Sequence, residues 1–203
     1  MLVEEPRTAP GAHAIRAALR AVYGDARSVD SGPAQPWRHG GPDPLDGITV
    51  YRCAEGRPHW HFVTFGFSEL YAKESDDPDV SGWGFELSLR LACALGERRP
   101  PDWGAPFLQS LARVVFEHSR PFRRGAVLEF GGPIVAGIKT DVTALVMGRD
   151  PKLGESRGPN GRLEFLIPIG ITTREVPPEG ASADALLAMI AKRNPMMITD
   201  LGV

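Results

Sequence analysis

The feature that most constrains the fold is a strict alternation of side chains near the middle of the chain. Every second position carries a large apolar residue, namely Phe85, Leu87, Leu89 and Leu91. The intervening positions carry polar residues, namely Glu86, Ser88 and Arg90. Because successive side chains of a β-strand point to opposite faces of a sheet, this pattern predicts a strand with one face in a hydrophobic core.

Other segments predict a mixed architecture. Residues rich in β-branched and aromatic side chains indicate further strands at 47–53, 58–67, 126–130, 134–138, 143–147 and 163–169. Apolar residues at helical spacing predict helices at 12–23, 103–118 and 183–192, with Asp102 as the N-cap of the second. Runs of strands with helices at both ends and in the middle indicate an α+β fold, with a mixed central β-sheet flanked by helices. The predicted core includes Trp60, Phe62, Phe65, Phe85, Leu87, Leu89 and Leu111.

The length of 203 residues is typical of one domain. We expect residues 1–10 to form a flexible N-terminal tail and residues 11–203 to form a single domain. Residues 25–46 are rich in Gly and Pro and predict a long irregular segment, which either wraps the core or serves a function. A second such segment, 148–162, ends in the turn signal Asn160-Gly161.

Charge and composition exclude several classes of partner. The net charge of −2 gives no bulk attraction to nucleic acid or to an acidic membrane, so neither is expected as a partner. No uninterrupted apolar run reaches the ~18 residues of a membrane span, and the acidic N-terminus does not resemble a signal peptide. Cys53 and Cys93 lack metal-binding spacing and are expected to be buried thiols. We therefore expect a cytoplasmic protein.

The pair His59-x-His61 raises the possibility of a metal site. Residues i and i+2 of a strand face the same side, so two imidazoles could bind one ion and support a metal-dependent hydrolase. A zinc site needs three or four ligands, and the other histidines show no companion spacing. The alternative is structural histidines that hydrogen-bond while packing in the core, and no metal or other cofactor is predicted.

The carboxylates Glu69 and Glu86 could perform acid–base chemistry if one were desolvated. The alternative for Glu86 is a cross-strand ion pair with Arg90 or another arginine. The chain has no nucleophile elbow, no phosphate-binding loop and no dinucleotide-binding motif. No catalytic residue is therefore predicted, and the chain is not expected to be an enzyme.

The acidic segment 71–80 lies between the two strongest strand patterns and offers a binding surface. Its aspartates, Asp76, Asp77 and Asp79, together with Glu69 could steer a basic protein partner. Tyr71 at the base of the segment has the chemistry of an interface anchor. The alternative is a solvated hairpin loop without a partner.

Several motifs, in order, resemble those of the Suppressor of fused domain family. They are GPDPLDGITVY at 41–51, HWHFVTFGFSELY at 59–71, SGWGFELSLRL at 81–91, the Pro101-Asp102-Trp103 segment with the helix after it, and MITDL at 197–201. The resemblance extends from about Gly11 to Leu201 and implies the family's fold.

The resemblance implies a protein-binding function without enzymatic activity. Animal members bind a segment of a transcription factor and carry an additional C-terminal domain, whereas this chain resembles the standalone bacterial members. Those bacterial members are often found beside polymorphic toxins and are thought to act as immunity proteins. The resemblance thus implies binding of a cognate protein, with a toxin as one candidate and a transcription factor, bound by a regulator scaffold, as another.

Overall fold

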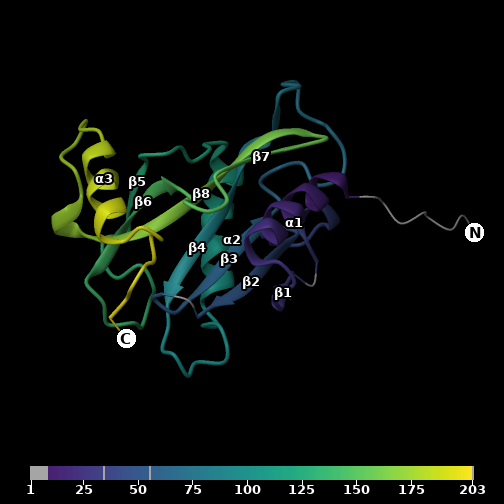
Figure 1. The fold of residues 1–203 in the computed structure, drawn as a ribbon. Coiled ribbons are helices and arrows are strands. Elements are labelled where there is room, and N and C mark those ends of the chain that lie inside the picture. Colours follow the sequence, from purple (N-terminus) through teal and green to yellow (C-terminus); the bar gives the residue numbers. More distant parts are fainter. Residues whose placement is uncertain (1–8, 34, 55, 203) are drawn as a thin grey trace, which may run out of the picture.

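A computed structural model describes residues 9–33, 35–54 and 56–202 (Figure 1). The helices in these residues are α1 (Pro10–Tyr23), α2 (Gly104–His118) and α3 (Asp184–Arg193), with short 3-10 turns η1 (Trp37–His39) and η2 (Thr173–Glu175). The strands are β1 (Ser28–Ser31), β2 (Gly47–Cys53), β3 (His59–Phe65), β4 (Val80–Ala92), β5 (Val127–Glu129), β6 (Val142–Arg149), β7 (Glu155–Gly158) and β8 (Gly161–Thr172).

One mixed sheet organises these elements. Its strand order is β1-β2-β3-β4-β8-β6-β5, and β7 pairs with β8 outside this path. The pair β4–β8 is parallel, whereas the other pairs are antiparallel. The long strands β4 and β8 therefore join an N-terminal antiparallel half to a C-terminal one. The predicted α+β class with a mixed central sheet is confirmed.

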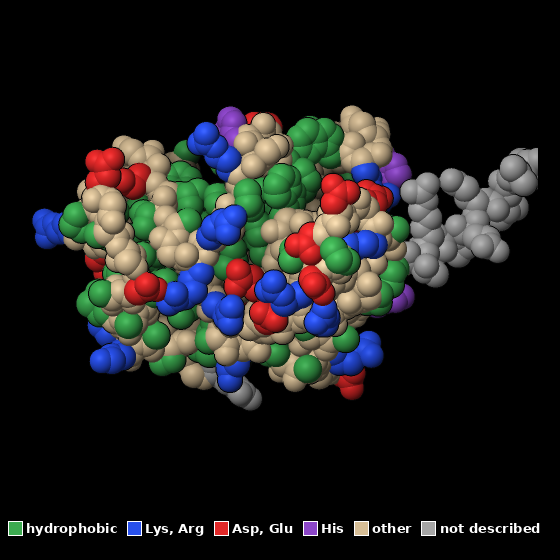
Figure 2. All heavy atoms as spheres, turned by 90° about the horizontal axis from the view of Figure 1, so that it is seen from above, with side chains coloured by type: hydrophobic (Ala, Val, Ile, Leu, Met, Phe, Trp, Pro, Cys, Tyr) green, Lys and Arg blue, Asp and Glu red, His purple; other side chains and the backbone are tan. Residues whose placement is uncertain are grey.

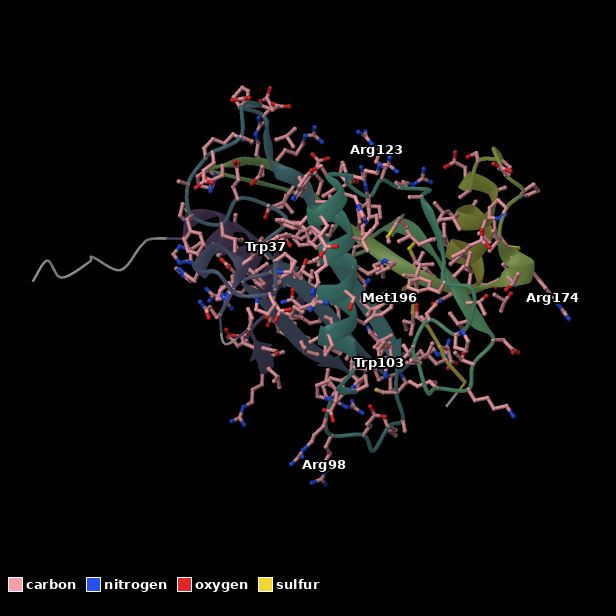
Figure 3. All side chains as sticks on the ribbon, turned by 180° about the vertical axis from the view of Figure 1, so that it is seen from behind. Trp37, Arg98, Trp103, Arg123, Arg174 and Met196 are labelled. Carbon is pink, nitrogen blue, oxygen red and sulfur yellow. The ribbon has the colours of Figure 1, made fainter. Side chains whose placement is uncertain are left out.

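The helices α1 and α2 cover opposite faces of the N-terminal half of the sheet (Figures 1 and 3). Ile15 and Leu19 of α1 pack in a cluster with Val63 and Phe65 of β3. The α2 side of the sheet has its own cluster, which includes Phe62, Leu89, Leu108 and Leu111. Helix α3 packs on β6 and β8 through a third cluster that includes Ile167, Ile169, Leu187 and Ile190. All seven predicted core residues are buried.

The structure corrects the interpretation of the polar residues that alternate with apolar ones in β4. Phe85, Leu87 and Leu89 face the core as predicted. Glu86 and Arg90 are also fully buried, because α1 and the segment after β6 cover the other face. The predicted ion pair between Glu86 and an arginine is wrong, since Glu86 accepts hydrogen bonds from the turn after β3 and Arg90 pairs with Asp150.

Asp150 is the centre of a buried polar network that joins four parts of the chain. It accepts hydrogen bonds from Ser88 Oγ (2.6 Å) and from both terminal nitrogens of Arg90 (2.6 and 3.1 Å). His61 Nε2 lies 3.4 Å from Asp150 Oδ2, and the Tyr23 hydroxyl is bonded to His61 Nδ1. The network therefore fixes the end of α1, β3, β4 and the turn after β6 relative to one another.

Burial decides the charge states of this network. Burial, followed by the nearby Arg90 cation, lowers the pKa of His61 to about 4, so the imidazole is neutral at pH 7. Burial also raises the pKa of Asp150, but His61 and Arg90 outweigh it and hold that pKa well below its usual range. The network thus contains one neutral histidine and one buried ion pair.

Several boundaries differ from the sequence predictions. Helix α2 begins at Gly104 after Trp103, so Asp102 is not its N-cap, and residues 134–138 form no strand. Two short strands, β1 and β7, lie in segments predicted to be irregular. Both gain their backbone hydrogen bonds by pairing with a longer neighbour, which a local pattern does not reveal. The turn signal at Asn160-Gly161 does connect two strands, β7 and β8.

Two further expectations concern the N-terminus and the cysteines. Residues 1–8 of the predicted tail lie outside the described residues, and Pro10 already belongs to α1. Cys53 and Cys93 form no disulfide, but both are half-buried rather than buried. No helix within the described ranges is long and apolar enough to span a membrane.

The neutral state of His61 predicts a loss of stability in mild acid. The pKa of His61 is about 4 in the folded protein and 6.5 ordinarily, so the unfolded chain binds more protons between these values. The free energy of unfolding should therefore fall as the pH drops through this window, by about 2 kcal/mol at pH 5 from His61 alone. Urea unfolding at pH 7 and pH 5 measures this difference.

The variant His61→Gln isolates the effect, because Glu86, whose pKa burial raises, contributes to the pH dependence with the opposite sign. Glutamine cannot be protonated, so its free energy of unfolding should change less with pH than that of the wild type. His118→Gln, at an exposed histidine, is the matched control. Equal pH dependence of the wild type and His61→Gln would contradict the assignment.

Candidate functional site

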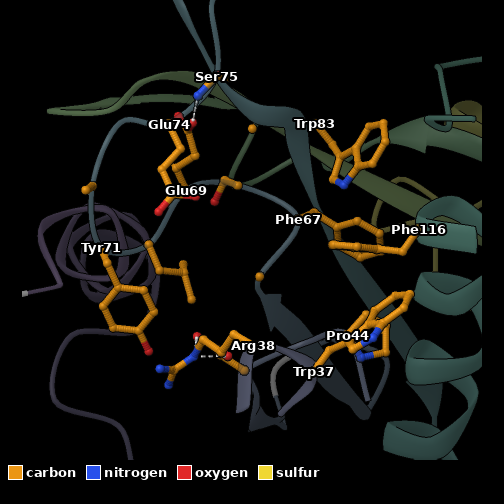
Figure 4. Close-up of a pocket in the computed structure, with 16 residues that line it drawn as sticks. Trp37, Arg38, Pro44, Phe67, Glu69, Tyr71, Glu74, Ser75, Trp83 and Phe116 are labelled. Carbon is orange, nitrogen blue, oxygen red and sulfur yellow. Dashed lines mark hydrogen bonds and ion pairs between the residues drawn. The ribbon is translucent and has the colours of Figure 1, made fainter. Parts of the chain in front are cut away.

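A groove of about 800 Å³ lies at the end of the sheet where β3 ends and β4 begins (Figure 4). The segment before β2, the turn after β3, the first residues of β4 and one residue of α2 form its walls. The groove is lined by Trp37, Arg38, Pro44, Asp46, Gly66, Phe67, Ser68, Glu69, Leu70, Tyr71, Ala72, Glu74, Ser75, Gly82, Trp83 and Phe116. It brings together segments that are far apart in the sequence.

One wall of the groove is aromatic. The ring of Phe116 from α2 lies 5.8 Å from Trp37, 5.7 Å from Trp83 and 5.9 Å from Phe67, measured between centroids. Trp37 remains 44% exposed, and Trp83 and Phe116 are half-buried. Tilted aromatic contacts of this kind hold the rings in fixed positions. The wall therefore offers a rigid apolar surface to a ligand.

The opposite wall is built around Tyr71 and Arg38. The guanidinium of Arg38 lies 4.6 Å from the centre of the Tyr71 ring, and Arg38 Nε donates to both carboxylate oxygens of Asp46 (2.7 and 2.9 Å). Partial burial, followed by the contact with Asp46, raises the pKa of Tyr71. Tyr71 is half-buried and lines the groove, and its role as an interface anchor stays a prediction.

Glu69 organises the acidic segment from inside. Its carboxylate accepts hydrogen bonds from the backbone N–H groups of Glu74 (2.7 Å) and Ser75 (2.5 Å), and from Lys73 Nζ (3.0 Å). Partial burial raises the pKa of Glu69, but these donors outweigh it and lower the pKa to about 2. Glu69 therefore lines the groove as an already paired carboxylate.

The three aspartates predicted to bind a partner lie on the exposed part of this segment. Asp77 accepts a hydrogen bond from the backbone N–H of Asp79 (2.9 Å), and Asp79 pairs with Arg157 at 2.9 Å. Neither Asp76 nor Asp77 has a salt bridge within the described residues. The aspartates thus form an acidic rim beyond Glu74, outside the groove lining itself.

Glu86 holds the turn that carries the groove's floor. Its buried carboxylate accepts hydrogen bonds from Thr64 Oγ1 (2.6 Å), Ser68 Oγ (2.6 Å) and the backbone N–H groups of Gly66 and Ser68 (both 3.0 Å). Burial raises the pKa of Glu86, and these four donors oppose that shift. Gly82 packs against the same turn with φ +55°, where a Cβ would lie 2.7 Å from the Phe67 carbonyl oxygen.

The histidine pair lies beside other protein groups rather than beside further metal-binding side chains of the described residues. His59 Nδ1 donates to the Arg57 carbonyl oxygen at 2.8 Å, and His61 contacts Tyr23 and Asp150. In the described part of the chain, no group of three or more His, Cys, Asp or Glu side chains lies close enough to hold a metal ion. Both histidines are buried in the sheet.

Sequence reasoning missed most of the groove. Trp37, Arg38, Trp83 and Phe116 come from four separate segments, and only the fold brings them together. One signal was present, because Trp37 and Arg38 lie in the Gly- and Pro-rich segment 25–46 that was expected either to wrap the core or to serve a function.

The surface seen from above has both apolar and acidic areas. Hydrophobic side chains gather in the upper half of this view, and acidic side chains lie beside them (Figure 2).

Comparisons with known proteins identify the family. The sequence profile of the Suppressor of fused protein (SUFU) family matches residues 41–202. The Suppressor of fused homologs of mouse and human are each 35% identical to this chain in alignments that cover 78% of it. The matched region is 36% of the length of either relative, so the chain spans about a third of the curated relatives it matches.

Solved structures show the same fold. A structure of the Sufu–Fu complex is similar with a TM-score of 0.80 and 25% identity, over 98% of this chain and 91% of that one. The structure of Drosophila Suppressor of Fused is similar with a TM-score of 0.88 and 23% identity, over 99% of this chain and 52% of that one. The structure of a putative Suppressor of fused homolog from Neisseria gonorrhoeae is similar with a TM-score of 0.57 and 13% identity, over 92% of this chain and 91% of that one. With the profile covering most of its length, this chain belongs to the Suppressor of fused protein family.

Proposed function

We propose that the chain is a non-enzymatic protein-binding module and that the groove with its acidic rim is its binding site. The observation that carries this proposal is the aromatic wall, in which two tryptophans and a phenylalanine stay accessible at the end of a rigid sheet. The described residues offer no assembled metal site to support a reaction at this place.

The residue types of the groove are those that contribute most to protein interfaces. Trp, Tyr and Arg are enriched among residues that dominate binding energy, and the groove holds Trp37, Trp83, Tyr71 and Arg38. Neither indole N–H of the two tryptophans donates a hydrogen bond to another described residue. Trp83 directs its nitrogen toward the groove (Figure 4). The wall can therefore bind an apolar side chain and donate to a neighbouring carbonyl group of the partner.

Charge indicates the kind of partner. Arg38 and Lys73 are occupied by Asp46 and Glu69, whereas the carboxylates of Glu74, Asp76 and Asp77 have no such salt bridge among the described residues. An acidic rim increases the association rate of a basic partner and disfavours an acidic one. The geometry thus favours a partner segment with an apolar side chain for the groove and basic residues for the rim.

The relatives support protein binding as the function. One similar structure is named as a complex of Sufu with Fu, so a protein of this fold is found with a protein partner. A toxin neutralised by stoichiometric binding and a transcription factor bound by a regulator scaffold are the two candidate partners. The toxin-binding immunity role, the bacterial type and the cytoplasmic location remain predictions, as does the extent of the single domain.

The alternative function, a metal-dependent hydrolase, has less support from the structure than from the sequence. His59 and His61 each bond through Nδ1 inside the sheet, and no third ligand stands near them among the described residues. The carboxylates Glu69 and Glu86 are both occupied by hydrogen-bond donors from the protein. His59, His61 and Glu86 do not line the groove, and Glu69 lines it as a carboxylate already bonded to protein donors.

Removing an aromatic residue of the groove should weaken binding of the partner. We expect Trp83→Ala and Tyr71→Ala to weaken binding at least about 30-fold, corresponding to ~2 kcal/mol for a central interface anchor. The tagged chain is used to recover its partner from the cell that encodes it, and the recovered partner is then titrated by calorimetry. Trp103→Ala, at a half-buried tryptophan outside the groove, is the matched control. Unchanged binding to both groove variants would refute the site.

Neutralising the rim should slow association without removing the anchor contacts. We expect Asp76→Asn with Asp77→Asn to lower the association rate several-fold at low salt, and to reduce the dependence of that rate on ionic strength. Stopped-flow kinetics with the recovered partner measures both effects. Glu179→Gln together with Glu155→Gln removes two negative charges at exposed sites outside the rim and serves as the charge-matched comparison. An association rate that does not respond to the rim variants would show that the aspartates are only a solvated loop.

A further inference from the structure

A second hollow, of about 360 Å³, adjoins the groove on the other side of the sheet's end. It lies between α1 and the strands β1, β2 and β3. Its lining consists of Ala9, Ala12, His13, Arg16, Asp30, Ser31, Gly32, Asp46, Gly47, Ile48, Thr49, Phe65, Leu70 and Tyr71. Asp46, Leu70 and Tyr71 also line the groove, so the two depressions meet at these three residues, which we call the Tyr71 bridge.

The two depressions lie on opposite faces of the sheet. The groove contacts α2 through Phe116, and the hollow contacts α1 through His13 and Arg16. These helices cover opposite faces, as the separate core clusters of Phe62 and Phe65 show. A ligand that filled both depressions would therefore cross the end of the sheet over the Tyr71 bridge.

Hydrogen bonds from other segments hold the backbone at the Tyr71 bridge and at the residue before it. The backbone N–H groups of Gly11 and Ala12, at the start of α1, lie 2.9 and 3.4 Å from the Leu70 carbonyl oxygen. Asn160 Nδ2 donates to the Glu69 carbonyl oxygen at 2.7 Å. The fit at Gly11 is so close that a Cβ there would lie 2.0 Å from the Glu69 carbonyl oxygen. The path between the depressions is thus preorganised, which lowers the entropy cost of binding.

The hollow differs from the groove in charge. Arg16 lies over Phe65, with its guanidinium carbon 5.0 Å from the ring centre, and is paired only loosely with Asp30 at 3.6 Å. Both side chains of that pair are more than half exposed, so the pair contributes little and Arg16 can exchange partners. His13 lies one turn away on the same helix. Asp30 also accepts a hydrogen bond from Thr49 Oγ1 (2.5 Å), and the second carboxylate of the lining, Asp46, pairs with Arg38. The exposed Arg16 is therefore the cation that the hollow offers above the Phe65 ring, in contrast to the acidic rim of the groove.

We infer that the groove and the hollow form one continuous site for an extended segment of a partner protein. The segment places basic residues at the acidic rim, an apolar residue against Trp37 and Trp83, and an acidic residue beside Arg16. Its charges thus complement those at the two ends of the path. This inference rests on the proposed function of the groove. It adds the path that the partner segment follows and the order of the charges along that segment.

Selection from a library of random peptides tests the inference directly, because it does not require an identified partner. Phage-displayed peptides of about 12 residues reach up to about 40 Å when extended, enough to cross the bridge. The full chain is the bait, and enriched peptides are synthesised and titrated against wild type, Arg16→Glu, Arg20→Glu and Trp83→Ala. Arg20 is exposed on the same helix but lines neither depression, so it is the matched control.

The inference expects peptides with basic residues at one end and an acidic residue at the other. They should bind Arg16→Glu at least 10-fold more weakly than wild type and bind Arg20→Glu equally well. Removing the acidic end of the peptide should abolish the difference between Arg16→Glu and wild type.

Peptides that lose affinity for Trp83→Ala but bind Arg16→Glu as well as wild type would overturn this inference and leave the proposed function standing. Peptides indifferent to Trp83→Ala, or no enrichment over a selection without bait, would count against both.

Discussion

The buried carboxylate of Glu86 is the interaction on which the groove depends. It lies in the middle of β4 with no cation bonded to it, and its oxygens are satisfied by hydroxyl and backbone donors of residues 64–68. Burying a carboxylate costs several kcal/mol unless hydrogen bonds replace its hydration. Those bonds form only when the chain after β3 folds back onto β4, so the carboxylate selects one conformation of that turn.

That conformation places the groove. The turn carries Phe67 into the aromatic wall and leads into Glu69, whose own carboxylate then orders the acidic segment. Asn160 and the start of α1 fix the carbonyl groups of Glu69 and Leu70 from the other side. Tyr71 therefore follows a backbone that is bound at several consecutive residues. The surface of the groove is thus already ordered, which lowers the entropy cost of binding at the proposed site.

The sequence predicted the parts of the fold that depend on local pattern. The alternation in β4 correctly placed Phe85 and Leu87 in the core, and helical spacing correctly located α1, because burial of one face leaves a periodic signal. The polar residues of β4 were misjudged for the same reason, since a pattern cannot show that α1 and Asp150 cover the second face. Tyr71 was predicted as an anchor from its place beside an acidic segment, and it lines the groove. Trp37 and Phe116 could not be found, because their proximity is a property of the tertiary fold.

The central claim is that a protein partner binds in the groove at the end of the sheet. Hydrogen–deuterium exchange of the chain, alone and in complex with the partner it captures, tests this most directly because it reports every backbone segment at once. The account predicts that protection on binding concentrates in residues 35–46 and 66–83, with little change in α3. Protection confined to α3 and the C-terminal strands, with none in those two segments, would contradict it.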